Sequence, residues 1–169
     1  MESKNLWAPW RINYIQGLGQ KSDCFICEYL KNPKDDKKNL VLWRSPLCIV
    51  LLNRFPYNNG HLLLAPSRHI PDFDEATDDE MLELIKLIRD SQKALSLAIK
   101  PHGFNIGTNF GRCAGAGLPG HLHIHIVPRW DGDTSFMSVC SDTKVISQSL
   151  TELFGQLKDI STEYNLPNL

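Results

Sequence analysis

The most constraining feature of this sequence is a seven-residue segment in which imidazole and aliphatic side chains alternate: His121-Leu122-His123-Ile124-His125-Ile126-Val127. Successive side chains of a β-strand point to opposite faces, so this spacing predicts a strand with three histidines on one face and aliphatic residues on the other. Three of the six histidines lie in this row. Core packing alone poorly explains a row of three histidines, because adjacent imidazoles need polar partners and repel one another when charged.

The alternating segment carries residues suited to chemistry at phosphorus. A neutral imidazole is a competent nucleophile, and its attack divides a difficult displacement into two easier steps through a covalent intermediate. Charge builds on the phosphoryl oxygens as they react, so backbone amides of a glycine-rich loop are useful nearby. Such a loop, with glycines at 111, 115, 117 and 120, directly precedes the histidines. An ordinary turn is the alternative interpretation of this loop.

The remaining pattern predicts an α+β fold with a mainly antiparallel sheet. Short apolar runs predict strands at 40–44, 47–52, 61–65 and 104–108, and we expect the last of these and 121–127 to be central. The polar segment 32–39 reads as an exposed loop.

Two helices complete the predicted fold. Thr77 and Glu80 have the spacing of a capping box, and they begin a long helix that extends toward Pro101. Its predicted apolar face is Met81, Leu84, Ile85, Ile88 and Leu95. Asp142 is the expected cap of a second, C-terminal helix with the apolar face Val145, Ile146, Leu150, Leu153, Phe154 and Leu157.

Charge and hydropathy exclude two classes of protein. Lys and Arg number 18 against 19 Asp and Glu, so the net charge of -1 gives no basic surface for nucleic acid. No apolar run approaches the roughly 20 residues that span a bilayer, and residues 1–15 lack the apolar core of a signal peptide. We therefore expect a cytoplasmic protein that binds neither nucleic acid nor membrane.

The cysteines indicate a metal site. Cys24 and Cys27 are separated by two residues, which lets both sulfurs reach one tetrahedral ion whose other ligands come from elsewhere. A surface thiol pair or a redox motif is the alternative, although no thioredoxin-like pattern surrounds them. We expect Cys48 to be a plain core residue, and Cys113 and Cys140 have no evident partners.

The sequence resembles the histidine triad (HIT) family, on the segment 121–127 followed by Pro128-Arg129-Trp130. The segments 6–11, 52–62 and 103–109 are similar to the diadenosine tetraphosphate phosphorylase branch, so the resemblance covers nearly the whole chain. It implies one HIT-like domain over 1–169, with an N-terminal segment 1–39 carrying the cysteine pair, a catalytic core 40–136 and a C-terminal helix within 137–169.

The resemblance also implies roles for individual residues. His123 would become nucleotidylated, His125 would contact the phosphate and assist the leaving group, and His121 completes the triad. Substrate contacts are implied for Asn53 at the ribose, Asn109 and the Ala116-Gly117 backbone at phosphates, and Leu51 in the base pocket. Asn53 has an alternative interpretation as a turn residue. His61 and His102 stand alone in the sequence, and we assign them no catalytic role.

Relatives with a similar cysteine pair bind zinc through two further histidines, which correspond here to His69 and His121. The resemblance thus implies one zinc ion per chain, held by Cys24, Cys27, His69 and His121. Four protein ligands leave no open position, so this zinc would be structural.

The leading hypothesis is a nucleotidyl transferase acting on dinucleoside polyphosphates, with phosphate favoured over water as the acceptor. Hydrolysis and action on nucleoside phosphoramidates remain alternatives, as does a nucleotide-binding sensor or scaffold. The resemblance implies a homodimer, formed through the long helix from Thr77 and an edge strand. Trp7, Trp10 and Arg11 either pack onto the core, which we favour, or reach an active site.

Overall fold

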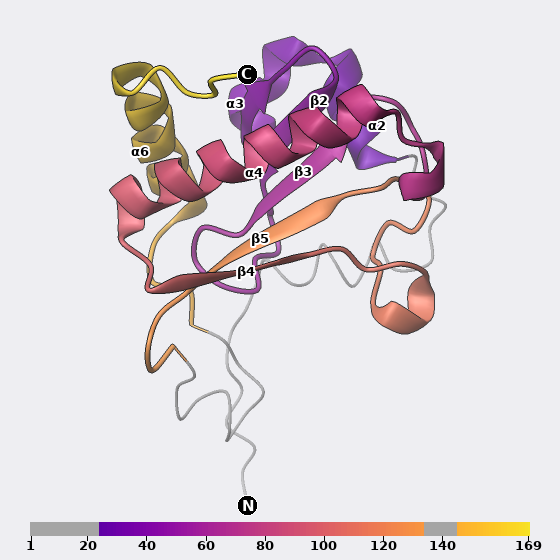
Figure 1. Ribbon diagram of the computed structural model, residues 1–169. Helices are drawn as coiled ribbons and strands as arrows, with labels where there is room; N and C mark the ends of the chain where they lie inside the picture. The colour runs from indigo at the N-terminus through magenta and orange to yellow at the C-terminus, as the bar shows by residue number, and fades with distance from the viewer. Residues whose placement is uncertain (1–23, 134–144) are drawn as a thin grey trace, which may run out of the picture.

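The computed structural model describes residues 24–133 and 145–169. Its centre is a five-stranded antiparallel sheet in the order β1-β2-β3-β5-β4 (Figure 1). The strands are β1 (Val41–Arg44), β2 (Cys48–Leu52), β3 (Leu62–Pro66), β4 (Gly103–Gly107) and β5 (Ile124–Arg129). The predicted α+β class is confirmed, while the expectations for Trp7, Trp10, Arg11, Cys140 and Asp142 concern residues outside those described.

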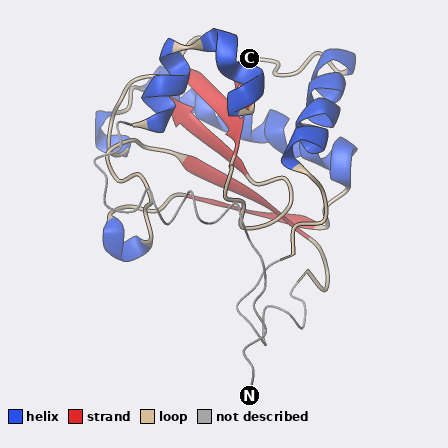
Figure 2. Cartoon of the chain, turned by 180° about the vertical axis from the view of Figure 1, so that it is seen from behind, coloured by secondary structure: helices blue, strands red, loops and turns tan. Residues whose placement is uncertain are grey.

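Helices cover both faces of the sheet (Figure 2). The long helix α4 (Asp78–Ile99) and α6 (Leu150–Glu163) bury one face, and α2 (Phe25–Lys31) packs on the other. Successive side chains of β2 point to opposite faces of the sheet. Val50 packs in the core on the α4 side, and Leu51 packs in the core on the α2 side. No helix in the described ranges is long and apolar enough to cross a membrane.

The capping box of α4 is confirmed, but its predicted buried face is partly wrong. Thr77 Oγ1 accepts from the Glu80 amide at 3.2 Å, and the Glu80 carboxylate accepts from the Thr77 amide at 2.8 Å. Met81 and Ile85 are 36% and 62% exposed. Which row of a helix faces the sheet depends on tertiary packing that the helical repeat alone does not encode. The buried residues are Glu80, Leu84, Leu87, Asp90, Ser91, Ala94 and Leu95, and the buried Glu80 is paired with Arg68.

Three further expectations need correction. Within residues 24–133 and 145–169, β4 pairs with β5 alone and is an edge strand, not a central strand as expected. Lateral strand order depends on long-range pairing, which apolar content does not encode. Residues 32–39 form short helices, η1 (Pro33–Asp35) and α3 (Asp36–Asn39), rather than a loop. Helix α6 begins at Leu150 because the Ser149 hydroxyl caps it, and Val145 and Ile146 lie before the helix. Cys48 is buried as predicted.

Candidate functional site

The three histidines of the alternating segment divide between two neighbouring clusters. His123 and His125 lie ring to ring, with centroids 5.0 Å apart, on the sheet face opposite α4. His121, just before β5, lies instead beside His69, also with centroids 5.0 Å apart. Both His121 and His123 are buried, at 1% and 6% exposure. The segment therefore connects the His123–His125 pair to a possible metal site.

Hydrogen bonds define the tautomer of His123. Its Nδ1 lies 2.8 Å from the main-chain carbonyl oxygen of His121, and a carbonyl oxygen only accepts. Nδ1 therefore carries the proton, and the lone pair of neutral His123 is on Nε2. Thr108 Oγ1 donates to the main-chain carbonyl of His123 at 2.7 Å, which fixes the backbone from the side of β4. His123 thus has the form that a nitrogen nucleophile needs.

His61, to which the sequence analysis gave no catalytic role, contacts His125. The main-chain amide of Tyr57 donates to His61 Nδ1 at 3.0 Å, so the proton of neutral His61 is on Nε2. That Nε2 lies 2.9 Å from Nδ1 of His125, which must accept. The proton of His125 is then on its own Nε2, a buried atom without a hydrogen-bond partner in the described structure.

Burial keeps this imidazole pair neutral. Desolvation, together with the neighbouring imidazoles of His125 and His123, lowers the pKa of His61 to about 3. Desolvation and the neighbouring His123 lower the pKa of His125 to about 4. At neutral pH both rings are uncharged, so His125 presents one N–H without bringing a positive charge into the site.

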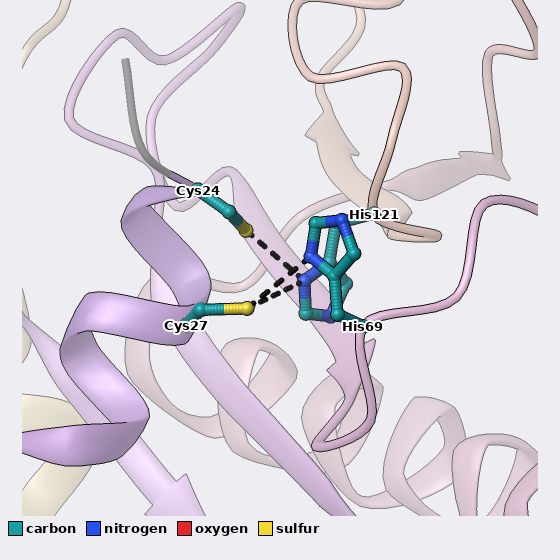
Figure 3. Close-up of side chains that lie close together, drawn as sticks. All are labelled: Cys24, Cys27, His69 and His121. Carbon is teal, nitrogen blue, oxygen red and sulfur yellow. Dashed lines mark hydrogen bonds between the residues drawn. The ribbon is translucent and has the colours of Figure 1, made fainter.

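The four predicted metal ligands, Cys24, Cys27, His69 and His121, come together (Figure 3). Cys24 Sγ lies 3.1 Å from His121 Nδ1, and Cys27 Sγ lies 3.2 Å from His69 Nδ1. All four ligand atoms are within 4.8 Å of one another. His121 donates from Nε2 to the carbonyl of Pro66 at 2.9 Å, which leaves its Nδ1 lone pair facing the sulfurs.

This donor set fits a tetrahedral ion and could hold a metal. Zinc bonds of about 2.3 Å to sulfur and about 2.0 Å to nitrogen place neighbouring S and N ligands about 3.5 Å apart. The observed separations of Cys27 Sγ from His69 and His121 are 3.2 and 3.5 Å. Burial raises the pKa of Cys24 to about 11, so its thiol keeps a proton unless a cation replaces it.

The residues predicted to contact the substrate differ in their burial and hydrogen bonding. Asn53 accepts at Oδ1 from the Phe55 amide at 2.9 Å and lies 3.2 Å from His61 Nδ1 through Nδ2, so it is both a turn residue and a neighbour of the histidines. Leu51 is buried in the α2-side core. In the glycine-rich loop, Asn109 is half-buried, Gly117 is exposed, and the Ala116 amide donates to Gly111 at 3.2 Å.

The chain is similar in sequence to known proteins. Residues 34–132 match the family model described as the HIT domain. The AP-4-A phosphorylase of Mycobacterium tuberculosis is 36% identical over 155 residues, covering 88% of this chain and 80% of the relative. The asymmetrical bis(5'-nucleosyl)-tetraphosphatase of Schizosaccharomyces pombe is 33% identical over 95 residues, covering 56% and 52%.

A solved structure is also similar in fold. The zinc-bound histidine triad family protein of Mycobacterium smegmatis matches with a TM-score of 0.68 at 21% identity, covering 85% of this chain and 96% of that chain. The region that matches the family model contains every histidine of both clusters and begins after the cysteine pair.

Proposed function

This chain belongs to the HIT domain family, and we propose that it transfers a nucleotidyl group from a dinucleoside polyphosphate to a small acceptor through a nucleotidyl-His123 intermediate. The observation that carries this proposal is the hydrogen bond from His123 Nδ1 to the carbonyl of His121 at 2.8 Å, which leaves Nε2 as a nucleophile. Relatives named AP-4-A phosphorylase and bis(5'-nucleosyl)-tetraphosphatase support the substrate class.

In the first step, the lone pair of His123 Nε2 attacks the α-phosphorus. A P–N bond forms, and the bond from the α-phosphorus to the bridging oxygen breaks, with its electron pair leaving on that oxygen. His125 donates a hydrogen bond from Nε2 to the departing oxygen. A polyphosphate departs as a stable oxyanion without full protonation, so a neutral imidazole whose pKa is lowered to about 4 suits this leaving group.

In the second step, an acceptor oxygen displaces His123 from phosphorus and the P–N bond breaks. We favour inorganic phosphate as the acceptor, because a relative that is 36% identical and covers 88% of this chain is named a phosphorylase. Water is the alternative, supported by the tetraphosphatase relative. Phosphoramidates form a third substrate class, but their amine leaving group needs a proton that neutral His125 supplies less readily.

Product analysis distinguishes these alternatives. Diadenosine tetraphosphate is incubated with the enzyme in matched reactions with and without inorganic phosphate, and His123→Ala serves as the control. ADP with ATP, formed only when phosphate is present, supports phosphorolysis. AMP with ATP in both reactions identifies a hydrolase. A nucleotide-binding sensor, the candidate of another class, would bind substrate equally in both proteins without turnover.

We further propose that Cys24, Cys27, His69 and His121 hold one structural zinc ion. The donor chemistry and ligand spacing support this assignment, as does the zinc-bound neighbour. When bound, zinc would supply a cross-link between the N-terminal part of the described chain and the segment that carries His123. Thiolate ligands persist in a reducing compartment, which favours the cytoplasm.

Asn53 would meet the ribose, Leu51 the base, and Asn109, Ala116 and Gly117 the phosphates, within one HIT domain spanning the chain. A homodimer would use α4 and the edge strand β4. Exposed apolar side chains on those two elements support this interface: Met81, Leu82, Ile85 and Ile106.

A further inference from the structure

Two exposed phenylalanines form a ring pair outside both hydrophobic clusters. Phe73 belongs to η2 (Phe73–Glu75), and Phe110 lies between β4 and η3 (Arg112–Ala114). Their centroids are 5.6 Å apart with an interplanar angle of 68°, an edge-to-face contact. The residues are 38% and 44% exposed. Two large aromatic side chains held together at the surface are typical of a contact site.

Each phenylalanine lies two or three residues from a residue that is hydrogen-bonded to the backbone at Leu122 or His123. The Leu122 amide donates to the Ile70 carbonyl at 2.6 Å, three residues before Phe73. Thr108 donates to the carbonyl of His123 at 2.7 Å, two residues before Phe110. A residue spans at most about 3.6 Å, so neither phenylalanine Cα is more than about 11 Å from its anchor residue.

Figure 1 shows η2 and the loop after β4 at the same end of the sheet.

The charges beside the two rings indicate how a polyphosphate chain would run relative to them. Phe73 is surrounded in sequence by carboxylates at Asp72, Asp74 and Glu75, which disfavour phosphate. Phe110 is followed by Gly111 and the exposed Arg112, whose positive charge favours phosphate. A polyphosphate chain that starts at His123 would therefore run along the glycine-rich loop, and an uncharged group at its far end would lie against the rings.

We propose that Phe73 and Phe110 form a stacking platform for the second nucleobase of a dinucleoside polyphosphate. This inference rests on the proposed function, since the first nucleotide is the one transferred to His123. Stacking on an aromatic ring tolerates every base, because every base has a π-face. The platform thus selects for the presence of a second nucleoside and is indifferent to its identity.

The test compares two substrates that differ only at the far end. Diadenosine tetraphosphate and adenosine 5'-tetraphosphate share the reacting phosphorus and the phosphate chain, but the second lacks the distal nucleoside. We expect the wild type to prefer the dinucleotide in kcat/KM by about 5- to 160-fold, the range of one stacked base. Phe110→Ala and Phe73→Ala each reduce this preference, with the rate on adenosine tetraphosphate unchanged.

Two further variants sharpen the result. Phe110→Trp keeps an aromatic face and retains the preference. Tyr164→Ala removes another exposed aromatic residue, at the end of α6, and leaves both rates unchanged. Equal wild-type rates on the two substrates, or equal losses on both in Phe110→Ala, would overturn the platform.

A binding measurement separates this inference from the proposed function. Calorimetry on His123→Ala protein, which does not turn over, gives Kd for both compounds with and without Phe110→Ala. We expect Phe110→Ala to raise the Kd for diadenosine tetraphosphate and to leave the Kd for adenosine tetraphosphate unchanged. If the wild type turns over neither compound, the proposed transferase function is wrong, and the calorimetry still decides the platform: identical Kd values with and without the Phe110 ring would overturn it.

Discussion

Nε2 of His61 lies 2.9 Å from Nδ1 of His125, across the pairing of β3 with β5. The main-chain amide of Tyr57 holds the other nitrogen of His61 as an acceptor at 3.0 Å. A backbone donor, which has no alternative protonation state, thereby sets the tautomers of both rings. The hydrogen bonds thus run from the Tyr57 amide through His61 to His125, and we propose that the remaining N–H, at His125 Nε2, donates to the oxygen of the leaving group.

Removing the His61 donor should impair catalysis more than it impairs folding. In His61→Leu, Nδ1 of His125 loses its partner and the His125 tautomer is no longer fixed, so we expect kcat to fall about 10- to 100-fold with little change in KM. His61→Gln keeps an N–H donor on a side chain of similar length and should recover much of kcat. Steady-state kinetics measures both variants, and equal losses in the two would contradict a positioning role.

The buried neutral His61 makes stability depend on pH. Its pKa falls from 6.5 to about 3 on folding, so below pH 6.5 the unfolded chain binds a proton that the folded protein excludes. Stability is therefore complete above pH 6.5 and decreases as pH falls toward 3. For His61 alone the free energy of unfolding should drop by about 2 kcal/mol between pH 7 and 5. Urea titrations at both pH values measure this loss, which His61→Gln should reduce.

Metal removal should affect both stability and catalysis, since His121 is a proposed ligand and its carbonyl also orients His123. Cys27→Ser should bind less zinc, and loss of the cross-link should lower Tm by about 10 °C. Cys113→Ser, at an exposed cysteine outside the cluster, is the matched control. Native mass spectrometry and thermal unfolding provide the readouts. Wild-type protein purified with zinc yet containing none would refute the proposed site.

Thr108 offers a test of the backbone support for His123. Thr108→Val keeps the shape of the side chain but removes the hydroxyl that donates to the His123 carbonyl at 2.7 Å. We expect about 1 kcal/mol less stability in urea unfolding and a several-fold lower kcat. Thr108→Ser retains the hydroxyl and should remain close to the wild type. A Val variant as active as the Ser variant would show that this hydrogen bond has no part in positioning His123.

Local patterns predicted much of this architecture. The Thr77 capping box correctly predicted the start of α4, because that signal depends on neighbouring residues. The alternation at 121–127 predicted the strand only in part: β5 begins at Ile124, so His121 and His123 precede it, and His121 lies beside His69 instead of sharing one face with His123 and His125. The resemblance gave the four metal ligands, which the structure brings together although they span 24–121 in sequence.

Features that depend on tertiary contacts were not predicted. His61 is a lone histidine in the sequence, and only the register of β3 against β5 brings it to His125. The one indication in the sequence was that His61 lies in the segment 52–62, which resembles the family, directly before β3. The exposure of Ile85 on α4 and the edge position of β4 likewise depend on which elements pack together.

The most direct test of the central claim is to trap the covalent intermediate. Wild-type enzyme is mixed with diadenosine tetraphosphate labelled at the α-phosphorus, quenched within one turnover, digested and analysed by mass spectrometry. We predict a nucleotidyl group on His123, absent from His123→Ala protein, which should also have no turnover. Product formation by His123→Ala protein, or wild-type turnover with no label on His123, would contradict the proposed mechanism.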